Sequence, residues 1–169
     1  GNIGYYTLFE SKIVGKDGKV IAIEPSPPNF QHLKKNLEIQ DSENVDAYNF
    51  AAGDIDGNVN FLVYEESNGS FTIPDGETTN LPGELIKVKA KRMDTFLDEL
   101  NINHVDFVRM DVEGYESHII DGMDKIIKKS KPMFQIEVHV TLLGIEGTKK
   151  FLKKFQDYGY EAKYYVPRD

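Results

Sequence analysis

The sequence predicts an α/β domain built on a doubly wound, mostly parallel sheet with helices on both faces. Over the first fifty residues, segments with apolar side chains at helical spacing alternate with short β-branched segments. The connections between these segments are only a few residues long. Because parallel strands need crossover connections, this alternation indicates parallel strands joined by helices. The total of 169 residues fits one domain, which we place over residues 1–169.

The N-terminal elements follow one another as turn, helix, strand, helix and strand. Two glycines mark residues 1–4 as a turn that opens a helix over Tyr5–Val14. Residues 19–24 form a β-branched run closed by a proline, as in strands buried on both faces. Ser26 and the prolines after it indicate the start of a second helix, since proline fits the first helical turn. The next strand is predicted over residues 45–50.

The middle of the chain has a different pattern. Residues 59–64 and 86–91 alternate apolar and polar side chains, which predicts an inserted antiparallel hairpin over about residues 59–91. A polar loop rich in glycine, proline and threonine lies between them, over residues 65–84. A loop of this length inside a compact domain is uncommon. It is either a functional lid or acceptor-binding loop, or a plain surface loop, and the sequence leaves both open.

The C-terminal part returns to alternating helices and strands. A short helix through Phe96, Leu97 and Leu100 is predicted after residues 93–95, and a long amphipathic helix over residues 115–129. The remaining predicted elements are strands over 105–110 and 133–138, a helix over about 145–158, and a final strand over 161–166.

Composition and charge exclude several classes of function. The net charge of −8 argues against sequence-independent binding to nucleic acid, which needs a basic face. The dense basic run over residues 125–131 fits a solvated helix end instead. No apolar run is long enough to span a membrane, and the N-terminus lacks the pattern of a signal peptide. Without cysteine the chain has no disulfides or thiolate chemistry, and we expect a cytoplasmic protein.

Polar residues that follow strands are the candidates for function, because ligands of open α/β sheets bind beyond the carboxyl ends of the strands. In the first turn, glycines permit close approach of the backbone to a ligand, and the helix start offers free N–H groups. Glu24 ends the next strand, where dinucleotide-binding folds place a carboxylate that accepts ribose hydroxyl protons. Because Pro25 fixes its geometry, we favour this binding role over that of a solvated strand-end carboxylate.

Further candidates follow the later strands. Asp54 is equally an acceptor for an adenine amino group or a turn residue. Asp111 lies at a strand tip, where the charged centre of a ligand would be, whereas Glu113 could serve only to compensate the helix dipole. Glu137 and His139 alternate at another strand end and so face one side; histidine is the usual proton carrier near neutral pH, although a structural role stays open. The other histidines are given no role: His32, His104 and His118.

Taken in order, these segments resemble the FkbM-type methyltransferases. The similar segments are residues 1–7 (GNIGYYT), 20–25 (VIAIEP), 51–54 (AAGD), 93–96 (MDTF), 105–116 (VDFVRMDVEGYE) and 136–139 (IEVH). They are colinear and span nearly the whole chain. The Asp-Val-Glu-Gly stretch after its strand is the most specific part, and the ordered set carries the resemblance.

The resemblance implies a Rossmann-like fold with an antiparallel last strand, S-adenosylmethionine as cofactor, and O-methylation of a small acceptor that carries a hydroxyl group. Carried over by position, Gly1, Asn2 and Gly4 would pack against the methionine part of the cofactor. Glu24, followed by Pro25, would hold the ribose.

The remaining roles fall on the later strand ends. Gly53 and Asp54 would face the adenine, and Asp111 would lie near the sulfonium and amino groups. We expect His139 or Asp111 to be the general base, with Glu113 as a helper. No metal is predicted, although Glu113 and Glu137 are of the type that binds a divalent cation.

The sequence departs from the family pattern at its first residue. Family members carry a strand with an acidic residue before the glycine turn, and this sequence begins inside that motif, so we expect the first family strand to be missing upstream of Gly1. Two other functions stay open. A nicotinamide-dependent oxidoreductase is disfavoured because the turn lacks a full G-x-G-x-x-G, and a non-catalytic binding domain is the other. Neither the acceptor nor the oligomeric state follows from the sequence.

Overall fold

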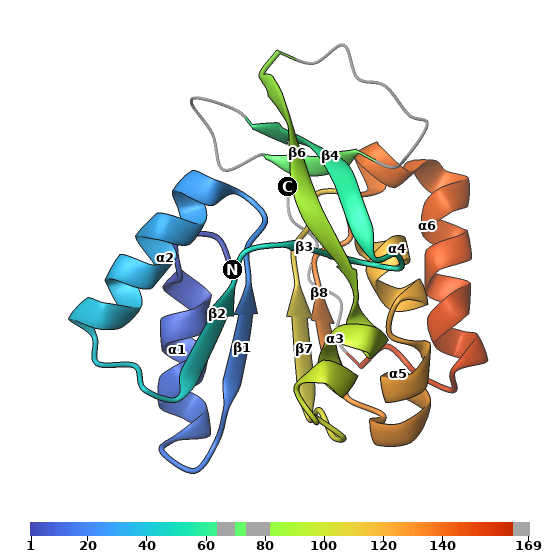
Figure 1. Cartoon of the computed structure of the whole chain (residues 1–169). Helices are drawn as coiled ribbons and strands as arrows, with labels where there is room; N and C mark the ends of the chain where they lie inside the picture. The colour runs from blue at the N-terminus through green and yellow to red at the C-terminus, as the bar shows by residue number, and fades with distance from the viewer. Residues whose placement is uncertain (64–69, 74–81, 164–169) are drawn as a thin grey trace.

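Two parallel strand pairs lie at the centre of the structure, a computed structural model that describes residues 1–63, 70–73 and 82–163. The pairs are β1 (Val20–Ile23) with β2 (Val45–Tyr48), and β7 (Phe107–Met110) with β8 (Met133–Ile136). In Figure 1 their four arrows point the same way, with helices beside both pairs. The carboxyl ends of these strands therefore face the same end of the molecule. Parallel strands flanked by helices confirm the predicted α/β class.

The first two helices lie where the sequence predicts them. Helix α1 (Tyr5–Val14) begins after Gly4, whose φ of 99° lies in the left-handed region that favours glycine. Helix α2 (Pro27–Ile39) begins after Ser26, whose side chain accepts the backbone N–H of Asn29. This cap and the proline in the first turn explain the sharp helix start directly after β1.

The predicted strand over residues 45–50 is shorter in the structure, because β2 covers residues 45–48 and residues 49–50 form no strand. β2 ends before Asn49, whose side-chain amide donates to two carbonyl oxygens at the end of β1. The chain then forms β3 (Ala51–Gly53), which pairs in parallel with β6 (Glu84–Arg92) of a second sheet. The turn that follows β3 therefore lies at the second sheet, and not at the sheet that contains β1.

The predicted antiparallel hairpin is confirmed. β4 (Gly57–Val63) pairs with β6 in a register that places Val59 opposite Val88. The prediction of an uninterrupted loop over residues 65–84 was wrong at β5 (Phe71–Ile73), which pairs with the other edge of β4. Most of that segment, residues 65–69 and 74–81, lies outside the described residues, so its function stays a prediction.

The predicted long helix over residues 115–129 is two helices, α4 (Glu116–Asp121) and α5 (Asp124–Ser130). They separate at Gly122, whose carbonyl oxygen accepts the backbone N–H of Asp94 at 2.8 Å. A Cβ on Gly122 would lie 1.8 Å from the carbonyl oxygen of Gly53, so only glycine fits there. The break therefore comes from close contact with β3, which periodicity does not report.

The buried carboxylate of Asp94 stabilises the start of α5. It accepts the backbone N–H groups of Lys125 at 2.9 Å and Ile126 at 3.0 Å. These donors belong to the first turn of the helix, where backbone N–H groups have no partner within the helix. Asp94 itself lies in α3 (Met93–Glu99), the short helix predicted after β6. The side chain therefore ties α3 to α5.

The C-terminal segment differs from the prediction at both ends. Helix α6 (Val140–Asp157) begins five residues before the predicted position 145 and contains a kink at Gly144, whose φ is 69°. In the described part of the predicted final strand, residues 161–163 form no strand and are exposed. Tyr160 instead anchors the chain, because its hydroxyl donates to the carbonyl oxygen of Pro132. Residues 164–166 lie outside the described part of the chain.

The main hydrophobic core includes side chains at the carboxyl ends of β7 and β8. It joins β7 to α4, α5 and α6 through side chains that are almost fully buried, among them Met110, Ile120, Ile127 and Phe151. Burying such side chains stabilises the fold by about 1.5–3 kcal/mol each. The packing holds the ends of β7 and β8 in a defined position. Among the helices of the described chain, none combines the length and apolar character needed to cross a membrane.

Candidate functional site

The glycine turn and the strand-end carboxylate that the sequence singled out lie in direct contact. Glu24 follows β1 and is only 7% exposed. Its Oε2 accepts the backbone N–H of Asn2 at 2.6 Å, and its Oε1 accepts that of Ser26 at 2.9 Å. The amino group of Gly1 donates to the carbonyl oxygen of Ile23 at 2.7 Å. Glu24 therefore ties the turn, the end of β1 and the start of α2 together.

Close packing explains why glycine occupies this turn. A Cβ on Gly4 would lie 2.8 Å from Cδ1 of Leu33, which is fully buried in α2. A Cβ on Gly1 would lie 3.0 Å from the carbonyl oxygen of Ile23 and 3.2 Å from Cδ2 of Leu33. A larger residue at Gly1 would press on the end of β1, and one at Gly4 would press on Leu33 of α2. The glycines are thus required by the fold, independently of a ligand.

Asp54, at the end of β3, contacts a residue to which the sequence gave no role. Its Oδ2 lies 3.2 Å from Nδ1 of His118, and the ring of His118 stacks on Tyr115 at 4.4 Å. A Cβ on Gly53 would lie 3.2 Å from Cε1 of the same tyrosine. Burial, and secondarily the charge of Asp54, raises the pKa of Tyr115 to about 12. Across the described chain, Asp54 forms no hydrogen bond or ion pair with Glu24.

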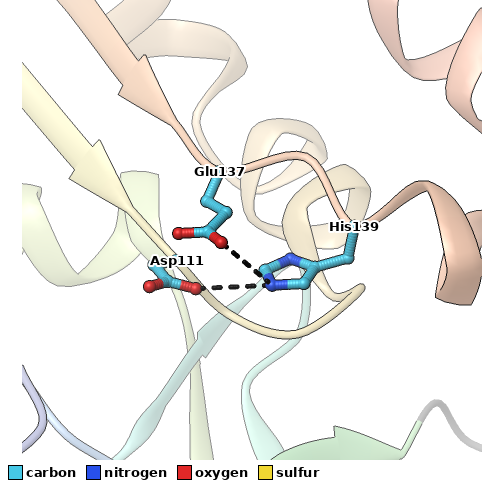
Figure 2. A group of neighbouring side chains, drawn as sticks. All are labelled: Asp111, Glu137 and His139. Carbon is cyan, nitrogen blue, oxygen red and sulfur yellow. Dashed lines mark ion pairs between the residues drawn. The ribbon is translucent and has the colours of Figure 1, made fainter. Parts of the chain in front are cut away.

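The acidic residues after β7 and the residues after β8 meet around one imidazole. β7 and β8 pair in parallel with Met110 opposite Ile136, so the residues that follow emerge side by side. The backbone N–H of Glu137 extends the ladder by donating to the carbonyl oxygen of Met110 at 3.0 Å. We define the acid–histidine cluster as Asp111, Glu113, Glu137 and His139; Figure 2 shows Asp111 and Glu137 facing the ring of His139.

Three carboxylates of this cluster face Nε2 of His139. The distances from Nε2 are 3.2 Å to Oε2 of Glu113, 3.6 Å to Oδ1 of Asp111 and 4.0 Å to Oε1 of Glu137. The last two exceed the range of a hydrogen bond. Nε2 therefore lies within ion-pair distance of all three carboxylates, with Glu113 as the nearest.

A fourth carboxylate, Glu116, holds the opposite side of the same ring. Oε1 of Glu116 lies 2.9 Å from Nδ1 of His139 and also accepts the backbone N–H of Gly114 at 3.2 Å. Because a carboxylate oxygen accepts, Nδ1 is the donor and carries the proton. Glu116 is fully buried. The sequence analysis missed its role, and the available signal was its place in the first turn of a helix, next to Asp111 and Glu113.

The backbone before α4 aims Glu113 into the cluster. Glu113 has a φ of 51° and Gly114 a φ of 94°, so two consecutive residues lie in the left-handed region. For a residue other than glycine this conformation is uncommon and marks strain held by its surroundings. A Cβ on Gly114 would lie 3.1 Å from Cβ of Leu142 in α6, so α6 presses on this turn.

Concentrated negative charge changes the proton affinity of the cluster. Burial alone would lower the pKa of His139, but the hydrogen bond that its ring donates to Glu116 and the charges of Glu113, Glu116 and Asp111 raise it above its usual value. The pKa of Glu113 is raised, first by burial and then, against the opposing effect of His139, by the neighbouring carboxylates. Both directions indicate a site that favours positive charge.

Comparisons with known proteins agree with the observed fold. A curated relative from Beauveria bassiana (strain ARSEF 2860), named Methyltransferase 1, is 26% identical over 140 residues, which cover 73% of this chain and 56% of the relative. The solved structure of methyltransferase FkbM from Methylobacillus flagellatus KT superposes with a TM-score of 0.59 at 20% identity, over 90% of this chain and 35% of that one. The chain thus spans about half of the curated relative and about a third of the solved one.

The family assignment rests on a match along nearly the whole chain. The sequence model described as the methyltransferase FkbM domain matches residues 1–162. This range includes the glycine turn, Glu24 and the acid–histidine cluster. The chain therefore belongs to the FkbM methyltransferase family.

Proposed function

We propose that this chain binds S-adenosylmethionine and serves the O-methylation of a hydroxyl group on a small-molecule or sugar-type acceptor. The observation that carries the proposal is the contact between the glycine turn and the buried carboxylate of Glu24. A strand-end carboxylate beside a glycine turn is the arrangement with which nucleotide-binding α/β folds hold a ribose. Because the chain belongs to a methyltransferase family, we infer that the nucleotide held in this way is a methyl donor.

The N-terminal turn and Glu24 would hold the methionine and ribose parts of the cofactor. Gly1, Asn2 and Gly4 would pack against the methionine part. Each carboxylate oxygen of Glu24 accepts one backbone N–H and retains a second lone pair for a ribose hydroxyl. Pro25 supports this geometry, since the side chain of Asn49 also donates to its carbonyl oxygen.

The adenine would lie near the turn after β3. In this proposal Asp54, which follows Gly53, accepts the adenine amino group. The stacked rings of Tyr115 and His118 lie beside it and would restrict the position of the Asp54 side chain. His118 would act as the partner that orients Asp54.

The acid–histidine cluster would supply the charge and the base for the transfer. Asp111 would lie near the sulfonium and amino groups, because an acidic site attracts and holds a cation. The cofactor supplies an electrophilic methyl group, which the acceptor oxygen takes as the bond to sulfur breaks and its electron pair stays on sulfur. The hydroxyl proton goes to Nε2 of His139 or to the carboxylate of Asp111, with Glu113 assisting. Placement of the acceptor in line with the methyl group is the main requirement.

A transfer assay tests the proposal. The full-length protein is incubated with methyl-labelled S-adenosylmethionine and a panel of hydroxylated small molecules and sugars. We expect label on an acceptor oxygen, and a fall of about 10²-fold or more in turnover for His139→Ala or Asp111→Asn. Binding of S-adenosylhomocysteine without turnover on any acceptor would support a non-catalytic binding domain instead. Binding of NAD in its place would support an oxidoreductase.

A further inference from the structure

We propose that the acid–histidine cluster binds a divalent cation of the magnesium and manganese class, held by Asp111, Glu137 and Nε2 of His139. Each of these residues offers one ligand atom, and the three atoms lie within 4.8 Å of one another. Figure 2 shows the two carboxylates directed at the same ring nitrogen. This inference deepens the proposed function of the site, and it rests on that function only for the part the ion plays in catalysis.

The spacing of the ligand atoms fits a shared ion better than direct contact. Nε2 lies 3.6 Å from Oδ1 of Asp111 and 4.0 Å from Oε1 of Glu137, both beyond hydrogen-bond range. Ligands that each lie about 2.1–2.4 Å from one ion are separated by about 3–4.5 Å from each other. The three atoms thus surround a point that a small cation would contact without a change of fold.

Glu116 gives a second, independent indication, because it is fully buried and lies outside the set of ligands. Oε1 of Glu116 accepts the hydrogen bond that Nδ1 of His139 donates, so Nε2 is the ring nitrogen that can offer a lone pair to a metal in the neutral imidazole. Oε2 of Glu116 is buried and has no hydrogen-bond partner among the residues that the structure describes, and a buried polar atom without a partner is costly. A carboxylate behind a ligating imidazole is the usual support of a protein metal site. A cation on Nε2 would supply the missing positive charge.

The charge balance of the site points the same way. Across the residues that the structure describes, neither Asp111, Glu113 nor Glu116 pairs with a lysine or arginine, and His139 is their common charged neighbour. One imidazole, even in its protonated form without a metal, cannot balance several carboxylates. The two carboxylates of the set suit magnesium or manganese, which prefer oxygen ligands and retain waters.

An ion here would act on the acceptor hydroxyl. A hydroxyl oxygen bound to a divalent cation has a lowered pKa and loses its proton more easily. Asp111 and His139 would then act as ligands in place of bases. The proton would pass to Glu113, the carboxylate of the cluster that is not among the three ligands, while the methyl group moves to the oxygen as described above.

Manganese binding tests this site without reference to activity. Mn²⁺ is titrated into the metal-free, cofactor-free protein, and the signal of free Mn²⁺ is followed by electron paramagnetic resonance. We expect one site per chain that Asp111→Asn and Glu137→Gln each weaken by at least tenfold. Glu116→Gln should weaken binding by about 10- to 100-fold, since the supporting carboxylate orients the imidazole.

The control is Asp106→Asn, an exposed carboxylate that pairs with His104 at the start of β7. It should leave Mn²⁺ binding unchanged, and circular dichroism should confirm that all variants fold. Absence of stoichiometric binding in the wild type, or binding equally strong in Asp111→Asn and Glu137→Gln, would overturn the inference. Calorimetry with S-adenosylhomocysteine, in a buffer that contains a chelator, tests cofactor binding separately. If the cofactor product binds but Mn²⁺ does not bind in the titration, only the proposed metal site is wrong. If Mn²⁺ binds but the cofactor product does not, only the proposed cofactor site is wrong.

Discussion

At the scale of single residues, two buried carboxylates organise the site. Glu24 accepts two backbone N–H groups from opposite sides, and Glu116 accepts one from the imidazole of His139 and one from the backbone. A buried carboxylate that receives hydrogen bonds holds its neighbours in one arrangement, because the loss of any partner leaves a desolvated charge. Each of these residues is therefore both a structural and a functional element.

Substitution of Glu24 tests this double role. In the wild type, each carboxylate oxygen of Glu24 accepts one backbone N–H. In Glu24→Gln, one of these two N–H groups would instead face the side-chain NH₂ group, which cannot accept it. We expect the free energy of unfolding to fall by about 1–3 kcal/mol. We also expect the affinity for S-adenosylhomocysteine to fall at least tenfold, measured by calorimetry at a urea concentration where the variant is folded. Glu43→Gln, at an exposed turn, is the matched control. A variant that retains wild-type stability and affinity would show that Glu24 holds neither the turn nor the ribose.

Tyr158 gives a pH-dependent prediction away from the site. Its hydroxyl donates to Oδ1 of Asp124 at 2.8 Å. Burial first, and then this hydrogen bond and the nearby acidic charges, raise the pKa of Tyr158 to about 12 from the usual 10. The folded state therefore keeps a proton that the unfolded state releases. The stability from this group is complete below pH 10 and is lost as the pH rises from 10 to 12.

Tyr158→Phe should remove both the hydrogen bond and part of the alkaline loss. We expect the free energy of unfolding at pH 7 to fall by about 1 kcal/mol. Between pH 10 and 12 the variant should lose less stability than the wild type. Urea denaturation at a series of pH values measures both effects. Tyr5→Phe, with a side chain 75% exposed, should change neither. An alkaline profile identical to that of the wild type would contradict the assigned cause.

At the scale of elements, local patterns predicted the parts of the fold that depend on local chemistry. The glycine turn, the helix over Tyr5–Val14, the strand directly before Glu24 and the antiparallel hairpin all lie close to their predicted positions. The broken helix at Gly122 was missed, because the break depends on contact with β3, a segment far away in the sequence. Helical periodicity continues across such a break and gives no sign of it.

The same distinction holds for the candidate site. Asp111, Glu137 and His139 were recognisable because each follows a strand, and the parallel register of β7 and β8 brings them together. Glu116 contributes through burial and through a contact with His139 across more than twenty residues of sequence. A single sequence carries neither kind of information. The pairing of Asp54 with His118 escaped prediction for the same reason.

The junction of α4 and α5 provides a test at this scale. Gly122→Ala places a methyl group 1.8 Å from the carbonyl oxygen of Gly53, so β3 and the helices must move apart. We expect a loss of more than about 2 kcal/mol in the free energy of unfolding, or failure to fold. Gly147→Ala lies within α6, where the nearest atom to a new Cβ is 3.5 Å away. This control should gain about 0.5–1 kcal/mol. Equal effects of the two changes would contradict the close contact between Gly122 and β3.

At the scale of the whole molecule, the strand ends share one direction and the chain is acidic. The arrows of β1 and β7 point the same way in Figure 1, so the Glu24 region and the acid–histidine cluster lie toward one end of the molecule. The chain carries a net charge of −8, and its cluster gathers four carboxylates around one imidazole once Glu116 is included. Such a surface favours cationic ligands over phosphate-rich ones.

This preference separates the methyl-donor function from the nicotinamide alternative. S-adenosylmethionine carries a sulfonium cation, whereas NAD carries a pyrophosphate that needs free N–H donors at a glycine-rich helix start. In the turn before α1, Glu24 accepts the backbone N–H of Asn2, and the N–H of Gly4 donates to the carbonyl oxygen of Gly1. These N–H groups of the turn are already engaged, so only those of the first helical turn stay open to a ligand.

Calorimetry with S-adenosylmethionine, S-adenosylhomocysteine and NAD tests the central claim most directly. The full-length protein is titrated with each ligand in turn, alongside Glu24→Gln. We predict one site for the methyl donor and its product, weakened at least tenfold in the variant, and no binding of NAD. Tight binding of NAD together with no binding of either methyl compound would contradict the account.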